Sequence, residues 1–244
     1  YKIAPKCIEL KQKIEEKILG FAKAHYAFNY QLLFYDVTTL YFETFKEDEL
    51  RKNGFSKDNK SQQPQILIGL MVSKEGFPIA YEVFSGNTFE GHTIIPSIQN
   101  FIKNNAAKDL TVVADAAMIS TENVKQLVLN KINYIVGARL GNISTSMLST
   151  IDKSINREDG KSIRIKTDNG YLVCSYSAVR YRKDKYEMEK QIEKATQVIE
   201  KPSKTKKLKF TQTDGMKISL NQALIEKTQK LLGLKGYYTN LETS

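Results

Sequence analysis

The sequence predicts an α/β protein in which helices flank a mixed β-sheet, with a mostly β insertion after the fifth strand. Three runs of β-branched and aromatic residues, 33–42, 65–73 and 78–84, follow one another along the chain. Two further runs, 110–115 and 133–139, alternate with segments of helical periodicity. Strands that meander pair antiparallel, whereas a helical crossover joins parallel strands, so the sheet should contain both directions.

The first run carries an acid, Asp36, among strand-forming residues. Alternation places Asp36 on one face with Phe34 and Thr38, and Tyr35 and Val37 on the other. A carboxylate buried in such a strand is costly unless a cation or hydrogen-bond donors compensate it. We therefore expect Asp36 to have a partner.

A second acid, Asp115, closes the fourth run. A right-handed crossover can lay this strand beside the first, and adjacent strands are about 5 Å apart. Asp36 and Asp115, 79 residues apart in the sequence, would then be neighbours. Such a pair suits metal ions spaced about 3.5–4 Å that act on a phosphodiester. Structural roles stay open at this point, a hydrogen-bonded strand residue for Asp36 and a turn or cap for Asp115.

Helical periodicity predicts three helices around these strands. They span residues 5–24, 91–105 and 121–131. The third is capped by Ser120 or Thr121 and buries Val124, Leu127 and Val128. The run at 65–73 is apolar on both of its faces, so we expect the sheet to be covered on both sides there.

The insertion is predicted to be basic. Residues 1–140 contain 17 Lys and Arg against 15 Asp and Glu, whereas residues 141–244 contain 20 against 12, a net charge of +8 out of +10. A turn signal at 168–170 predicts a hairpin over 162–178, followed by a charged helix over 181–200. A lysine tract follows, made of Lys201, Lys204, Lys206, Lys207 and Lys209. Such a surface suits a polyanion, and a solvated lysine-rich surface is the alternative.

Composition excludes several classes of protein. A hydrophobic content of 41% and a charged content of 26% are those of a globular chain. No apolar run approaches the ~18 residues of a membrane span. Cys7 and Cys174 are too few for a disulfide framework or a zinc site, which suits a reducing cytoplasm. The chain opens on Tyr1 rather than Met and shows no signal peptide, so we expect it to be truncated at its N-terminus.

Three stretches resemble the DDE transposases of bacterial insertion sequences, which have an RNase H-like catalytic core. They are residues 36–42 (DVTTLYF), residues 54–88 with GFSKD, Pro64-Gln65, Gly69-Leu70, Gly76, Pro78 and GNT, and residues 113–117 (VADAA) followed by Tyr134, Ile135 and Arg139. Each motif is weak alone, and their order and spacing make them specific together. The resemblance covers residues 30–140 well and the remainder loosely.

The resemblance implies that Asp36 bridges two Mg²⁺ or Mn²⁺ ions and that Asp115 holds one of them. It implies the central part of a cut-and-paste transposase, acting on double-stranded DNA at transposon ends and target, in the bacterial cytoplasm and nucleoid. A homodimer is one candidate assembly, and the sequence leaves the oligomeric state open. The candidate DNA contacts are Lys57, Arg139, Lys204, Lys206 and Lys207.

The family's third acid lies in a Tyr-x2-Arg-x3-Glu-x6-Lys signature after the insertion. Residues 141–244 contain Tyr181, Glu187 and Lys194, without Arg and Glu at the required offsets. We therefore expect the third acid to lie outside the chain, and activity of the chain alone to be negligible. A truncated DNA-binding or dimerising regulator and an RNase H-like nuclease are the alternatives.

The same motifs set the expected domain boundaries. They give an N-terminal helical segment at 1–29, a catalytic core at 30–140, a basic insertion at 141–233 and a return to the core at 234–244.

Overall fold

The computed structural model describes residues 2–26, 31–55, 60, 62–200, 208–214 and 217–242. The chain forms two compact units, one made of Tyr1–Gly137 with Tyr238–Ser244 and the other of Ala138–Tyr237. The first unit is therefore built from two stretches of the sequence, one that precedes the second unit and one that follows it.

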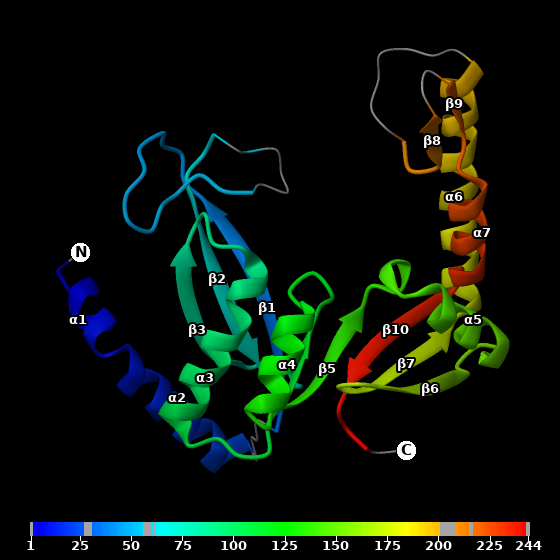
Figure 1. Cartoon of the computed structure of the whole chain (residues 1–244). Coiled ribbons are helices and arrows are strands. Elements are labelled where there is room, and N and C mark those ends of the chain that lie inside the picture. The colour runs from blue at the N-terminus through cyan, green and yellow to red at the C-terminus, as the bar shows by residue number, and fades with distance from the viewer. Residues whose placement is uncertain are drawn as a thin grey trace. The chain divides into compact units, whose positions relative to one another are not determined.

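The sheet of the first unit has the strand order β3-β2-β1-β4-β5 (Figure 1). The strands are β1 (Leu32–Tyr41), β2 (Gln65–Val72), β3 (Pro78–Ser85), β4 (Thr111–Ala114) and β5 (Asn133–Ala138). β1, β2 and β3 form an antiparallel meander, while β4 is parallel to β1 and β5 is parallel to β4. The mixed sheet and the crossover predicted from the sequence are confirmed.

Two helices, α3 (Ile94–Asn105) and α4 (Thr121–Leu129), cover one face of this sheet (Figure 1). α3 follows a 3₁₀ turn, η1 (Glu90–His92). Ser120 caps α4 by accepting a hydrogen bond from the backbone N–H of Asn123. α4 buries Val124 and Leu127, as predicted, but Val128 is 39% exposed, because the contact face of this helix is narrower than the apolar stripe.

The core lies between the sheet and these helices. Alternate residues of β1, Leu33, Tyr35 and Val37, are buried in it. On the other face Phe34 is 37% and Leu70 38% exposed, so in the described part of the chain the sheet is not covered on both sides, contrary to expectation. Much of the accessible surface of a folded protein is apolar, so apolar residues on both faces of a strand do not require a layer on each side.

The N-terminal segment forms two helices, α1 (Ala4–Glu9) and α2 (Lys11–Tyr26), where one helix was predicted. Leu10 ends α1, and its N–H bonds back to the carbonyl of Lys6. α2 buries Leu19, which joins the core of the sheet. Lys11 lies over the ring of Tyr81 at 4.5 Å, which ties the start of α2 to β3.

The second unit contains three helices and five strands within its described residues. They are α5 (Thr145–Ser154), β6 (Ser162–Thr167), β7 (Gly170–Tyr176), α6 (Ala178–Glu200), β8 (Thr211–Asp214), β9 (Lys217–Leu220), α7 (Gln222–Leu231) and β10 (Leu234–Thr239). The predicted hairpin is β6–β7. The helices hold 10, 23 and 10 residues, more than the strands, so the mostly β composition expected for this insertion is wrong. α5 was missed because only Leu148 and Ile151 are buried on it.

The chain returns to the first unit through Asn240. Its side-chain carbonyl accepts a hydrogen bond from the N–H of Tyr134 at 2.9 Å, and its amide donates to the carbonyl of Ile132 at 3.2 Å. This side chain thus pairs with the start of β5 as a strand backbone would.

Candidate metal and active site

The two predicted acids stand at the ends of a matched register. The β1–β4 pairing runs from Leu32 opposite Thr111 to Tyr35 opposite Ala114, a constant offset of 79 residues. Asp36 and Asp115 each follow the last pair. Asp36 lies on the face of the sheet that α3 and α4 do not cover, since its neighbour Tyr35 points into the core, and Asp115 is exposed directly after the buried Ala114.

Both carboxylates are exposed, so the cost of burial expected for Asp36 does not arise. Asp36 Oδ1 accepts a hydrogen bond from the N–H of Val37 at 2.9 Å, and Asp115 Oδ1 accepts one from Ala116 at 2.7 Å. Neither aspartate is ion-paired with a basic side chain among the residues that the structure describes. The partner expected for Asp36 is, in that part of the chain, a hydrogen-bond donor, the N–H of Val37, and not a basic side chain.

The donor set suits a hard divalent cation. Carboxylate oxygens are the ligands that Mg²⁺ prefers, and an exposed pair on one sheet face can take such an ion without displacing protein cations. Across the described ranges, no group of three or more His, Cys, Asp or Glu side chains gathers in a geometry that could hold a metal.

A polar cluster lies behind Asp36, on the helix-covered face. The Tyr35 hydroxyl donates to Thr93 Oγ1 at 2.8 Å and lies 3.2 Å from Ser97 Oγ. Burial raises the pKa of the Tyr35 phenol above its ordinary value, and the hydrogen bonds with Ser97 and Thr93 oppose that rise. A side chain at Gly69 on β2 would overlap the Tyr35 hydroxyl, so the glycine makes room for the ring.

A second polar contact lies behind Asp115. Asn123, 8% exposed, donates from Nδ2 to the carbonyls of Gly91 at 2.7 Å and Met118 at 2.9 Å. The N–H of Met118 donates to the carbonyl of Asp115 at 3.2 Å. The sequence alone did not point to Asn123. Its one signal was a polar residue adjoining Val124 on the buried stripe of a predicted helix.

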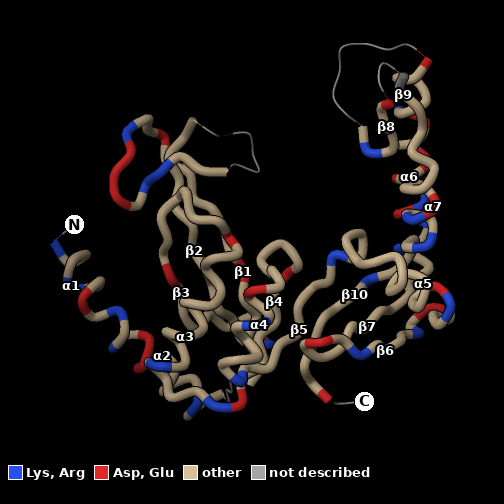
Figure 2. The backbone as a smooth tube through the Cα atoms, viewed as in Figure 1, with Lys and Arg blue, Asp and Glu red and all other residues tan. Residues whose placement is uncertain are grey.

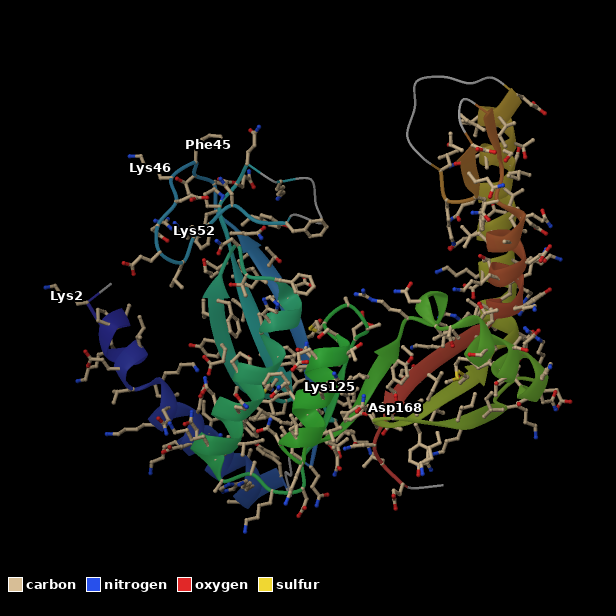
Figure 3. The ribbon with its side chains drawn as sticks, in the orientation of Figure 1. Lys2, Phe45, Lys46, Lys52, Lys125 and Asp168 are labelled. Atoms are coloured by element: carbon tan, nitrogen blue, oxygen red, sulfur yellow. The ribbon has the colours of Figure 1, made fainter. Side chains whose placement is uncertain are left out.

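The long connection between β1 and β2 begins at the carboxyl end of β1, the strand that carries Asp36. It is fixed at its base, where Lys52 and Gln65 exchange two backbone hydrogen bonds. Phe45 and Phe55 are 82% and 84% exposed, and Figure 3 shows Phe45 and Lys46 directed away from the sheet. The loop therefore presents aromatic surface at the carboxyl end of β1.

The candidate DNA contacts are only partly placed. Lys57, Lys204, Lys206 and Lys207 lie outside the described residues. Arg139 is exposed and directly follows β5, at the start of the second unit. Figure 2 shows Lys and Arg side by side with Asp and Glu along α6 and α7, so the described helices of this unit are mixed in charge.

The second unit also has a cleft of about 490 Å³ among α6, α7 and β10. Its basic lining residues are Arg180, Lys209, Lys227 and Lys235. Its two acids are already engaged: Asp184 pairs with Arg180 at 3.4 Å and accepts from the N–H of Gly233, and Glu187 pairs with Lys183 at 3.9 Å. The rest of the wall is formed by leucines and Met188 together with small and uncharged polar residues, among them Asn142, Gln191 and Thr228. The cleft therefore suits an anionic group.

None of the described helices combines the length and apolarity that a membrane crossing requires.

Comparison with known proteins gives one family match. The family model described as "Transposase DDE domain" matches residues 27–231. No match was found among curated proteins. Among solved structures, the chain is similar to one from the cryo-EM structure of a piggyBac transposase synaptic complex with hairpin DNA, at 16% identity and a TM-score of 0.42. That similarity covers 61% of this chain and 31% of the other, so this chain spans less than a third of that relative's length.

Proposed function

Because this chain belongs to the transposase DDE domain family, we propose that it carries the acid pair of a DNA transposase, with Asp36 and Asp115 as ligands of two divalent ions, Mg²⁺ or Mn²⁺. The proposed reaction is the hydrolysis and transfer of DNA strands in cut-and-paste transposition. The observation that carries this proposal is the register of the β1–β4 pair. The pairing of the two strands ends one residue before each aspartate.

In this proposal Asp36 would hold both ions and Asp115 would hold one of them. When bound, the ions supply Lewis-acid stabilisation of the attacking and leaving oxygens of a phosphodiester. The protein orients the carboxylates through the N–H groups of Val37 and Ala116, each of which holds one oxygen. Exposure of both acids leaves room for a DNA strand to approach. The third acid implied by the resemblance, the glutamate of the Tyr-x2-Arg-x3-Glu-x6-Lys signature, would complete the ligand set.

The DNA partner is double-stranded, at the ends of a bacterial insertion sequence and at its target, in the cytoplasm and nucleoid. A homodimer would bring two such sites to two transposon ends. Support comes from the motifs around Asp36 and Asp115 and from the +8 charge of residues 141–244. Electrostatic attraction to phosphates supplies most of the sequence-independent affinity of such proteins.

We assign the catalytic core to residues 30–140 and the DNA-facing insertion to residues 141–233, flanked by a helical segment at 1–29 and a return at 234–244. Lys57 and Arg139 would contact DNA from the core side, and the lysine tract with Lys204, Lys206 and Lys207 from the insertion. The basic lining of the cleft among α6, α7 and β10 favours an anionic partner for the insertion.

This function is tested by the binding of Mn²⁺ to the purified chain. Binding is measured as the loss of the free-ion signal in electron paramagnetic resonance. Asp36→Asn and Asp115→Asn should each weaken binding by more than the roughly 10–100-fold that loss of an outer-shell partner costs. Asp168→Asn is the matched control, because Asp168 is exposed in the β6–β7 turn (Figure 3). Equal affinity in the wild type and both site variants would overturn the proposal.

A further inference from the structure

Four polar side chains are buried behind the acid pair, on the helix-covered side of the sheet. Tyr35, Thr93, Ser97 and Asn123 are 2%, 0%, 1% and 8% exposed. A buried polar group is costly unless it is hydrogen-bonded. The partners of these side chains therefore show which segments they hold together.

The first pair of links joins β1 to the turn before α3. Tyr35, the residue before Asp36, donates to Thr93 Oγ1, and Thr93 Oγ1 donates to the carbonyl of Glu90 at 2.7 Å. Ser97, one turn further along α3, lies within hydrogen-bond distance of the same phenol. The segment that carries Asp36 is thus fixed to η1.

The second set of links joins the same turn to the segment that carries Asp115. Asn123 donates to the carbonyl of Gly91 in η1 and to the carbonyl of Met118. Met118 in turn donates from its N–H to the carbonyl of Asp115. Both acid-bearing segments therefore meet at η1 through buried hydrogen bonds.

Asp115 needs such a constraint more than Asp36 does. β1 continues beyond Asp36 to Tyr41 and stays paired with β2, so the Asp36 backbone is held by a ladder. β4 ends at Ala114, so Asp115 stands outside its ladder, at the start of a turn. Asn is a weak helix former, which makes its place on the buried side of α4 more costly than that of an apolar residue.

We propose that Asn123 positions Asp115, and that Tyr35 acting through Thr93 holds Asp36 to the same turn. One buried network then sets the spacing of the two carboxylates. This inference rests on the proposed function only for the identity of what the carboxylates bind. Tyr35, Thr93 and Asn123 are positioning residues, because none of them reaches the exposed face.

Mn²⁺ affinity provides the first test, measured at a temperature at which every variant is folded. Asn123→Ala and Tyr35→Phe should each weaken Mn²⁺ binding by about 10–100-fold, as outer-shell partners of metal ligands do. Thr93→Val should weaken Mn²⁺ binding to the same extent. Thr93→Ser keeps the hydroxyl, so it should bind Mn²⁺ as the wild type does. Ser73→Ala is the control, since Ser73 is equally buried and holds the β2–β3 turn. Affinity changes that merely followed stability, with Ser73→Ala behaving like Asn123→Ala, would overturn the inference.

A second test does not depend on metal. The N–H groups of Val37 and Ala116 donate to the two carboxylates, so their ¹⁵N–¹H resonances monitor the site in the metal-free chain. Asn123→Ala should shift the Val37 resonance as well as that of Ala116, and Tyr35→Phe should shift Ala116. The network would be overturned if each variant shifted only the amide of its own segment, Ala116 for Asn123→Ala and Val37 for Tyr35→Phe. If the two variants show these shifts but the wild-type chain binds no Mn²⁺, the proposed function is overturned and the network stands.

Discussion

Tyr35 of β1 lies opposite Ala114 of β4 in a parallel pair, and an aspartate follows each of them. Because side chains alternate along a strand, Asp36 lies on the face opposite Tyr35, and the register places Asp115 directly after the residue that pairs with Tyr35. A slip of one residue in this pairing would move one aspartate into the core side of the sheet. The position of the acid pair therefore depends on how Tyr35 is held.

The space for the Tyr35 ring depends on Gly69. Gly69→Ala places a methyl group on the Tyr35 hydroxyl, so we expect a decrease of about 1–3 kcal/mol in the free energy of unfolding, as for other overpacked cores. Gly20→Ala is the matched control, since Gly20 lies in α2 with open space around it. It should be more stable than the wild type by about 0.5–1 kcal/mol. Urea denaturation of both variants measures this, and equal midpoints for Gly69→Ala and the wild type would contradict the packing described.

Alkaline pH should destabilise the second unit through Cys174. Burial raises the pKa of the Cys174 thiol from 9.0 to about 11. Between these values the unfolded chain loses the proton and the folded chain keeps it, so the unfolded state binds fewer protons and stability falls as pH rises. The difference of about two units between the two pKa values corresponds to a loss of about 2–3 kcal/mol in the free energy of unfolding.

Cys174→Ala should remove this part of the pH dependence, measured as the denaturation midpoint between pH 8 and pH 11. Cys7→Ala should retain it, because Cys7 is exposed. A variant at Cys174 that keeps the full slope would show that another group causes it.

The lysine tract should contribute to the salt dependence of DNA binding. Changing Lys204, Lys206 and Lys207 together to Gln should reduce the slope of log affinity against log salt by roughly 2–3 units, about 0.9 for each phosphate that is no longer neutralised. Because contacts to phosphate carry no sequence information, any duplex should be affected equally. Filter binding at several salt concentrations measures the slope.

The matched control uses Gln at Lys183, Lys185 and Lys190 on α6. Lys183 and Lys185 already face Glu187 and Glu189 at 3.9 and 3.8 Å, so this triple variant changes the net charge equally without removing a lysine that binds phosphate. If both triple variants lower the slope alike, the tract acts only through net charge and does not touch the DNA.

The sheet was predictable because its signals are local. Runs of strand formers, a turn at Gly76 and helical stripes between the later strands specify the meander and the crossover. The positions of Asp36 in the first run and Asp115 at the end of the fourth then predicted that the two acids are neighbours. The exposure of Asp36 was not predictable, because the alternation of β1 is symmetric and only packing decides which face the helices cover.

The insertion was less predictable for a different reason. The charged helix predicted over 181–200 is found as α6, but α5 buries only Leu148 and Ile151, so its sequence carries a weak stripe among polar residues. Asn123 shows the same limit at the site. Its role depends on the carbonyls of Gly91 and Met118, whose positions follow from tertiary structure and not from local sequence.

The most direct test of the central claim locates the metal on the protein. In ¹⁵N–¹H spectra of the chain, substoichiometric Mn²⁺ should broaden the amide resonances of Val37 and Ala116 first, because both amides donate to the proposed ligands. The double variant Asp36→Asn, Asp115→Asn should lose this broadening, while the amide of Asp168 stays sharp in both proteins. Broadening centred elsewhere in the chain, or unchanged in the double variant, would contradict the assignment of Asp36 and Asp115 as the metal-binding pair.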